Sequence, residues 1–422
     1  MSRRPADSFA HTLEESLYAD PLPAILSPLS RASFFTGISR AFDLAEGRRP
    51  GHAQRVAFVG LTIASELKLD ATSTEAAFFA CLLHDLGHAL GEFEPVPPDW
   101  RGRLEALAAH SRAGARLARK LGFPEAVAEA IAVHHASWSS PEGTTPPHDT
   151  PLAGRIVRLA DAFVAFLEAH RSVLLARREA TKALSDLAGS EVDPELAAPL
   201  ASVVKRDEFW LELYDNDLSA TLMALNYGGL LDETELLETA SVLSDIVDAR
   251  NRRRVGSGRT VAYLAFRLAE ELGLPEQRAR MVRIAALLRD IGTLAIPPQI
   301  LSKPDILSVG ELQAMQLHPV YARDILSEIP GFGAVSWWVG CHHERVDGKG
   351  YPGMLEGSEV PTESQIIGLC EAYVALTSER PYRAAMSPDD ALIVLEGQAG
   401  ARFDHALVEA FAEIAAEARP AI

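Results

Sequence analysis

Histidine and aspartate side chains recur along the first half of the chain in a pattern that metal-dependent hydrolysis requires. Neutral imidazoles are ligands for Fe, Mn, Zn and Ni, and a carboxylate can bridge two ions and offset their charge. Two ions so bridged can clamp a phosphoryl group for in-line attack. We therefore expect two divalent ions, Fe or Mn, held by seven residues: His52, His84, Asp85, His110, His134, His135 and Asp161.

The expected arrangement has Asp85 as the bridge between the two ions. Around one ion we place His52, His84 and Asp161, and around the other His110, His134 and His135. The chain has no thiolate among these ligands, which favours a hydrolytic centre over a structural zinc site.

The second half of the chain repeats these positions with part of the chemistry changed. The interval from the first position to the pair that ends in aspartate is 32 residues in both halves, and the later interval between histidines is 24 residues in both. Such repeated spacing indicates an internal duplication. The second set consists of Ser257, Arg289, Asp290, His318, His342, His343 and Glu371.

The second set has lost two imidazoles, at Ser257 and Arg289. An arginine keeps its proton under ordinary conditions, so it places a fixed positive charge beside Asp290 or Glu371, where it mimics a cation or forms a salt bridge. The degenerate site that remains can hold one ion at most, and we expect no catalysis there. Its members are Asp290, His318, His342, His343 and Glu371.

Helices must position these residues, because apolar side chains recur with helical spacing and alternating strand patterns are nearly absent. Val56, Val59, Ile63 and Leu67 are one example. We predict an all-α protein of two tandem helical bundles related by duplication. The first spans residues 31–213, a connector covers 214–240, and the second spans 241–422.

The composition of the chain limits the classes of partner that it can bind. The formal net charge of −18 disfavours a nucleic-acid polymer or an anionic membrane, since both need a broad basic surface. The three cysteines are too few and too scattered for a disulfide framework. No apolar run reaches the roughly 18 residues that span a membrane, and no apolar segment follows the N-terminal arginines. We expect a cytoplasmic protein.

The second half resembles the HD-GYP family of cyclic-dinucleotide phosphodiesterases over residues 241–417. The resemblance rests on three strings, AALLRDIGTLAIPPQILSKPDILSVGE, HHERVDGKGYPGMLEGSEVP and LTSERPYRAAMSPDDAL, which include Gly350, Tyr351 and Pro352. The first half resembles the same fold with a shortened GYP segment. The family implies HD-domain helical bundles, a centre of two or three metals, and hydrolysis of cyclic di-GMP or a related cyclic dinucleotide.

The chain departs from the family at several positions. Three-metal members carry a glutamate four residues before the first histidine, where this chain has Arg48, so we expect two metals. The family's phosphate-binding lysine is replaced by His88 in the first half and by Thr293 in the second. His88 is the candidate to donate to a phosphoryl oxygen or protonate a leaving group. The first half also lacks a counterpart of Arg345, so the candidate substrate-binding residues are Arg112, Arg116 and Arg155.

These features predict a phosphodiesterase whose first half hydrolyses a cyclic dinucleotide, with Asp85 and His88 as catalytic residues and the second half as a regulatory pseudo-enzyme. The GYP segment is either a turn kept for folding or, as the resemblance implies, a docking surface for a diguanylate cyclase. A second copy of the chain, in a homodimer, is a further candidate partner. The alternatives are a non-catalytic signalling adaptor and, from the HDLGH string alone, an HD nucleotide phosphohydrolase.

Overall fold

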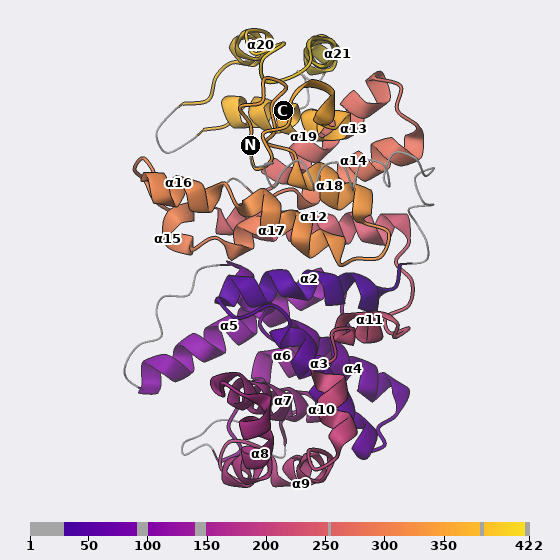
Figure 1. Ribbon diagram of the computed structural model, residues 1–422, viewed down its shortest axis with the longest axis vertical. Coiled ribbons are helices and arrows are strands. Elements are labelled where there is room, and N and C mark those ends of the chain that lie inside the picture. The colour runs from indigo at the N-terminus through magenta and orange to yellow at the C-terminus, as the bar shows by residue number, and fades with distance from the viewer. Residues whose placement is uncertain (1–28, 91–99, 140–148, 252–254, 380–383, 418–422) are drawn as a thin grey trace, which may run out of the picture. The chain divides into compact units, whose positions relative to one another are not determined.

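The computed structural model describes residues 29–90, 100–139, 149–251, 255–379 and 384–417 (Figure 1). These residues fold into helices, and apart from isolated β-bridges the described part of the chain contains no strand. The predicted all-α fold is therefore confirmed. No helix within the described residues is long and apolar enough to cross a membrane.

The chain divides into two compact units, and the first covers residues 30–231. Its helices, in chain order, are α2 (Arg31–Glu46), α3 (His52–Glu66), α4 (Ala71–Leu83), η1 (Leu86–Leu90), α5 (Trp100–Lys120), α6 (Glu125–Val133), α7 (Leu152–Ala169), α8 (Val173–Leu187), α9 (Pro194–Val203), α10 (Asp207–Leu213) and α11 (Leu218–Met223).

The second unit begins at residue 232. Its helices are α12 (Glu233–Arg250), α13 (Ser257–Glu271), α14 (Glu276–Leu288), η3 (Ile291–Ala295), α15 (Pro298–Leu301), α16 (Val309–Met315), α17 (His318–Ser327), α18 (Gly333–Gly340), η4 (Gly357–Glu359), α19 (Thr362–Thr377), α20 (Pro388–Glu396) and α21 (His405–Glu417). The division falls inside the predicted connector 214–240, so that α11 belongs to the first unit and α12 to the second.

The two units repeat one order of elements. In each, a long helix leads into a helical hairpin, α3 and α4 or α13 and α14, and a short 3-10 helix follows the aspartate at the end of that hairpin. Another helix then packs on the 3-10 helix, as α5 does on η1 and α17 does on η3. The central helices α7 and α19 each contact both members of their hairpin. The internal duplication is thus visible in the packing as well as in the sequence.

Buried apolar residues hold each bundle together around its central helices. In the first unit Phe78 and Phe79 of α4 are buried beside Phe123 and Tyr227, and α7 buries Phe163. In the second unit Tyr373 of α19 packs edge-on against Phe411 of α21. Each large apolar side chain so buried contributes about 1.5–3 kcal/mol relative to leaving it in water.

Helix ends present most of the predicted ligands. His52 and His318 are the first residues of α3 and α17, while His84 and His134 follow the last residues of α4 and α6. His110 and Asp161 lie within α5 and α7. The bundle therefore brings together side chains that are far apart in sequence.

A buried aspartate fixes the start of the helix that carries His52. Both carboxylate oxygens of Asp43 accept backbone N–H hydrogen bonds, from Gly51, His52 and Ala53, at 2.7–3.0 Å. These are donors that the first turn of a helix leaves without an internal partner. In the second unit Asp248 accepts in the same way from Gly256 and Gly258.

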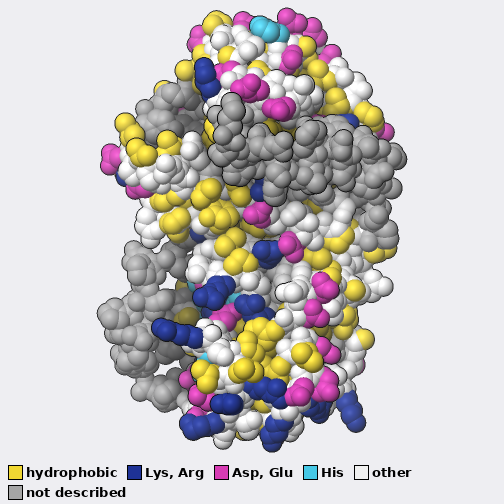
Figure 2. Space-filling model, viewed as in Figure 1, with side chains coloured by type: hydrophobic (Ala, Val, Ile, Leu, Met, Phe, Trp, Pro, Cys, Tyr) yellow, Lys and Arg dark blue, Asp and Glu magenta, His cyan; other side chains and the backbone are white. Residues whose placement is uncertain are grey.

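Acidic and basic side chains are interspersed over the face of the molecule that Figure 2 shows. Lys and Arg do not form one continuous field on that face. The net charge of −18 works against tight binding of a polyanion.

Candidate metal centre

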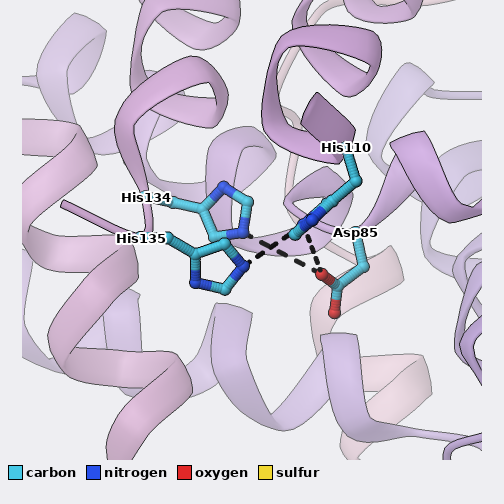
Figure 3. Close-up of side chains that lie close together, drawn as sticks. All are labelled: Asp85, His110, His134 and His135. Carbon is cyan, nitrogen blue, oxygen red and sulfur yellow. Dashed lines mark hydrogen bonds and ion pairs between the residues drawn. The ribbon is translucent and has the colours of Figure 1, made fainter. Parts of the chain in front are cut away.

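The structure brings all seven predicted ligands of the first unit to one place. Figure 3 shows His110 of α5 and the adjacent His134 and His135 at the end of α6 gathered beside Asp85, with His110 and His134 facing Asp85 and His135 facing His110. Ligand atoms of these four residues lie within 4.8 Å of one another, and so do those of His52, His84 and Asp85. The remaining ligand, Asp161, lies with its Oδ1 3.4 Å from His52 Nε2 and 3.8 Å from His84 Nε2.

The two oxygens of Asp85 face different groups of histidines. Oδ2 lies 2.8 Å from His84 Nε2, on the side where Asp161 also lies. Oδ1 lies 3.6 Å from His110 Nε2 and 3.9 Å from His134 Nε2. A carboxylate placed in this way can bridge two cations, which is the arrangement expected from the sequence.

Hydrogen bonds fix which ring nitrogen faces the centre. His84 Nδ1 donates to the carbonyl of Cys81 at 2.8 Å, and His134 Nδ1 donates to the carbonyl of Ile131 at 2.7 Å. A proton held on Nδ1 leaves the lone pair of Nε2 available to a metal ion. Both helices therefore end by turning an imidazole with its free nitrogen inward.

Buried polar atoms at the centre lack hydrogen-bond partners within the described residues. These atoms are His52 Nε2, His84 Nε2, His134 Nε2, Asp85 Oδ2 and Asp161 Oδ1. A buried polar group without a partner costs about 1–3 kcal/mol, so a cluster of five needs an explanation. Divalent cations at the centre would satisfy them all, and the donor set of imidazole nitrogens and carboxylate oxygens suits such ions.

The two sides of the centre differ in charge. Burial opposes protonation of His84, but its hydrogen bond with Asp85 and the charges of Asp85, Asp161 and Glu46 together outweigh burial and raise the His84 pKa to about 10. Burial lowers the pKa of His134 to about 3 and that of His135 to about 2. A positive charge is thus favoured next to Asp85 and His84, while His134 and His135 remain neutral and able to act as ligands.

Two glutamates that the sequence did not single out complete the surroundings. Glu168, two helical turns after Asp161 on α7, has its Oε2 3.1 Å from His52 Nδ1 and so orients that ring. Glu46, the last residue of α2, has a carboxylate oxygen within 4.8 Å of ligand atoms of Asp85 and His88. Burial and the charge of Asp85 raise the pKa of Glu46 to about 8.

Arg48 brings a positive charge to the edge of the same cluster. Its guanidinium donates to Glu46 at 2.5 Å and lies 3.9 Å from Asp85 Oδ2 and 3.8 Å from Asp161 Oδ1. Arg48 therefore offsets part of the negative charge on two of the candidate ligands.

His88 lies at the centre, as expected from its place in the motif. Its ring stacks on that of His110 with centroids 4.3 Å apart, and its Nε2 lies 3.9 Å from Asp85 Oδ1. Burial lowers the pKa of His88 to about 4. The imidazole is therefore neutral near pH 7, where it can donate one N–H hydrogen bond but does not act as an imidazolium acid.

The three arginines predicted to bind substrate lie outside the clusters of candidate ligand atoms. Arg112 and Arg116 are exposed on α5. Arg155 donates to the buried carboxylate of Asp193 at 2.6 Å, and Asp193 caps α9. Among the described residues, the clusters of candidate ligand atoms include none of the three, and their role in binding substrate stays a prediction.

The second unit repeats this geometry around Arg289. Ligand atoms of His318, His342 and His343 lie within 4.8 Å of one another, and Asp290 Oδ1 lies 3.7 Å from His318 Nε2. The Arg289 guanidinium forms a salt bridge with Asp290 at 3.0 Å and lies 3.7 Å from Glu371. The predicted salt bridge of Arg289 is therefore present with both carboxylates.

The GYP segment forms a compact loop beside His343. The ring of Tyr351 stacks on that of His343 with centroids 4.8 Å apart, and the peptide bond between Tyr351 and Pro352 is cis. The buried carboxylate of Glu344 accepts backbone N–H groups of Gly353 at 2.5 Å and Leu355 at 3.1 Å. At Gly350 a Cβ atom would lie 2.5 Å from the backbone of Glu344 and Arg345, which explains the glycine of the triplet.

Comparison with known proteins agrees with the duplicated architecture. Residues 49–165 and residues 241–407 match two family models, each described as an HD domain. The chain is 29% identical to the 3'3'-cGAMP-specific phosphodiesterase 3 of Vibrio cholerae, over 87% of this chain and 90% of that protein. This chain is a tandem HD-domain protein of the HD-GYP family. It is accordingly a hydrolase of the phosphodiesterase type.

Other relatives of the tandem HD protein support this assignment. A crystal structure of a cyclic GMP-AMP-specific phosphodiesterase of V. cholerae matches it with a TM-score of 0.66 and 27% identity, over 92% of this chain and 98% of that one. The cyclic di-GMP phosphodiesterase response regulator RpfG of Xanthomonas campestris is 37% identical over 41% of this chain and 46% of its own length.

Proposed function

We propose that the first HD domain of this chain hydrolyses a phosphodiester bond of a cyclic dinucleotide in a centre of two divalent ions, and that the second HD domain is a regulatory pseudo-enzyme. The proposal rests on one contrast. The first domain gathers seven imidazole and carboxylate ligands with Asp85 between them, whereas in the second a guanidinium takes the corresponding place.

The chemistry of the centre and the names of the relatives support this substrate class. The V. cholerae relative is named for 3'3'-cGAMP and the X. campestris relative for cyclic di-GMP. Both compounds are cyclic dinucleotides that carry two anionic phosphodiesters. Hydrolysis of one of them breaks a P–O bond and adds water, so that the ring opens to a linear dinucleotide with a terminal phosphate.

Residues of the first domain have distinct roles in this reaction. When bound, the two ions supply Lewis-acid activation of water and of the phosphoryl group. Asp85 holds the two ligand groups at a fixed separation, and Glu168 fixes the orientation of His52. His88, neutral near pH 7, donates a hydrogen bond to a phosphoryl oxygen. The buried helix ends that carry His84 and His134 hold this geometry in place before the substrate arrives.

The test compares the two aspartates in the same purified full-length protein. With Mn²⁺ or Fe²⁺ supplied, we expect turnover of 3'3'-cGAMP or cyclic di-GMP. Asp85→Asn should lower kcat/KM by at least about 100-fold, the upper end of what weaker perturbations around metal ligands cost. The matched change Asp290→Asn in the second domain should leave kcat/KM within about threefold of the original value.

The reverse result, with loss only in Asp290→Asn, would place catalysis in the second domain. Binding of a cyclic dinucleotide without any turnover, in protein that contains its ions, would favour the signalling adaptor. Turnover of mononucleotides alone would favour the HD nucleotide phosphohydrolase.

A further inference from the structure

The candidate site of the second domain reproduces the first domain's geometry with a guanidinium in place of an imidazole. Arg289 Nη1 donates to the carbonyl of Ala286 at 2.8 Å, and His84 Nδ1 donates to the carbonyl of Cys81 at 2.8 Å. Arg289 Nη2 lies 3.0 Å from Asp290 Oδ2, and His84 Nε2 lies 2.8 Å from Asp85 Oδ2. Arg289 and His84 are therefore anchored to the backbone in the same way. The histidine can bind a cation, whereas the arginine is itself a cation.

A second ion does not fit beside this arginine. The Arg289 side chain is 2% exposed, so its charge is poorly screened by water. Its guanidinium already forms ion pairs with the two carboxylates that would have to bind an ion there, Asp290 through Oδ2 and Glu371 through Oε2. Ser257 also supplies no imidazole at the first position. The residues at this position of the second domain therefore do not fit the second of the two ions that the fold family implies.

The other half of the site keeps a complete set of ligands for one ion. His318 Nδ1 donates to the carbonyl of Met315 at 2.8 Å, and His342 Nδ1 to that of Val339 at 2.5 Å, so both rings turn Nε2 inward. The two Nε2 atoms lie 3.4 Å apart. His343 belongs to the same cluster, and Asp290 Oδ1 lies 3.7 Å from His318 Nε2. Three imidazoles and one carboxylate oxygen suit Mn, Fe, Ni or Zn.

One of these ligands also supports the GYP loop. The Tyr351 ring lies against His343, and the Tyr351 N–H donates to the His343 carbonyl at 3.3 Å. An ion that fixes the His343 ring would fix the surface on which Tyr351 stacks.

We propose that the second domain binds a single divalent ion through His318, His342, His343 and Asp290, that Arg289 permanently replaces the other ion, and that the bound ion orders the GYP loop through His343. The site is then structural or regulatory and supports no two-ion chemistry. The inference builds on the proposed division of roles between the domains, but metal content tests it without any assay of turnover.

The test counts ions on the full-length chain loaded with Mn²⁺ and freed of excess. The wild-type chain should show a spin-coupled pair from the first domain together with one uncoupled Mn²⁺ in its electron paramagnetic resonance spectrum. His342→Ala with His343→Ala should remove one ion per chain, and the uncoupled signal with it. Ser257→His with Arg289→His should add one ion per chain and convert the uncoupled signal into a coupled one.

A matched control makes the reverse change in the first domain. His52→Ser with His84→Arg should remove one ion and leave an uncoupled one in its place. An unchanged ion count in the Ser257→His, Arg289→His protein, or in the His342→Ala, His343→Ala protein, would overturn the proposal. Circular dichroism shows whether each variant folds. If one of the two second-domain variants does not fold, the ion count of the other one tests the proposal.

Hydrogen–deuterium exchange tests the link to the loop. Mn²⁺ should slow exchange of the amides of residues 350, 351 and 353–355 severalfold in the wild-type chain but not in the His342→Ala, His343→Ala protein. Tyr351→Ala should abolish this protection while keeping the ion. Equal exchange with and without Mn²⁺ in the wild-type chain would refute the ordering of the loop. Because neither readout uses substrate, a failure of the proposed hydrolysis would leave these results unaffected.

Discussion

Each candidate centre has an arginine near its carboxylates, and the two arginines differ in burial and in their distance from those carboxylates. In the second domain Arg289 is buried and 3.0 Å from Asp290. In the first, Arg48 is one quarter exposed and lies 3.8–3.9 Å from Asp161 and Asp85. Coulomb energy falls with distance and with screening by water, so we expect Arg48 to weaken cation binding without replacing a cation.

Removing the charge of Arg48 should therefore tighten metal binding. We expect Arg48→Met to lower the dissociation constant for Mn²⁺ in the first domain by about tenfold, a modest share of the Coulomb energy of two charges near a protein surface. The change also removes the hydrogen bond between Arg48 and Glu46. Calorimetric titration of the metal-free protein measures the effect.

Arg55 provides the control for Arg48. It donates to Glu168 at 2.6 Å, and no ion pair joins it to Asp85 or Asp161 within the described residues. Arg55→Met should change the dissociation constant by no more than about twofold. If Arg48→Met left metal affinity unchanged or weakened it, Arg48 would instead be a residue that holds the ligands in place.

The sequence could predict that seven side chains cluster because the duplication repeats their intervals. Glu168 could not be found in this way, since Ser378 stands at the corresponding distance after Glu371. Asp43 does have a counterpart, because it precedes His52 by the same nine residues that separate Asp248 from Ser257. That interval was a usable signal, but an aspartate that caps a helix looks in sequence like any surface aspartate.

At the scale of elements, the glycine of the HD motif sets how closely two helices approach. A Cβ atom at Gly87 would lie 2.1 Å from the carbonyl oxygen of His110, and one at Gly292 would lie 2.0 Å from that of His318. The contact is with backbone, which cannot swing away as a side chain can. The 3-10 helices η1 and η3 therefore pack this closely on the helices that carry these histidines only because Gly87 and Gly292 have no side chain.

Gly87→Ala should separate η1 from α5 and displace His110 from Asp85. We expect a loss of about 3 kcal/mol in the free energy of unfolding, the upper range for overpacking, together with weaker metal binding. Chemical denaturation and metal titration measure the two effects. Gly310→Ala is the matched control, since a Cβ there has nothing within 4 Å, and alanine favours a helix by up to about 1 kcal/mol.

Equal stability of the Gly87→Ala and Gly310→Ala proteins would show that η1 can shift without cost. Sequence patterns predicted helices on both sides of this contact. They could not predict the contact itself, because helical periodicity reports which face is buried and not how near two backbones come.

At the scale of the whole molecule, duplication gives the chain two cores whose sets of candidate metal ligands differ. Each domain has its own buried apolar residues, and the two compact units divide near residue 231. An ion stabilises the fold that binds it in proportion to the logarithm of its concentration over its dissociation constant. Two ions in one domain and one in the other should therefore stabilise the domains unequally.

The three cysteines can report this difference. Cys81 is buried in the first domain, while Cys341 and Cys370 are buried in the second. Burial raises the pKa of each thiol well above its usual range, so the thiolate that reacts with a disulfide reagent forms only when the domain opens. In native protein without denaturant we expect all three thiols to be unreactive.

In moderate urea, saturating Mn²⁺ should slow labelling of Cys81 more than labelling of Cys341 and Cys370. Each ion present at 100 times its dissociation constant adds about 2.7 kcal/mol, which is roughly a 100-fold reduction in the open population. Two ions in the first domain should thus protect Cys81 by about the square of the factor seen for the second domain. Mass spectrometry of labelled peptides separates the three sites. Equal protection of all three cysteines would mean either that the domains unfold together or that each domain already binds two ions. The Ser257→His, Arg289→His protein distinguishes these two explanations. If each domain already binds two ions, the protection of Cys341 should not change in that protein, whereas it should increase if the domains unfold together.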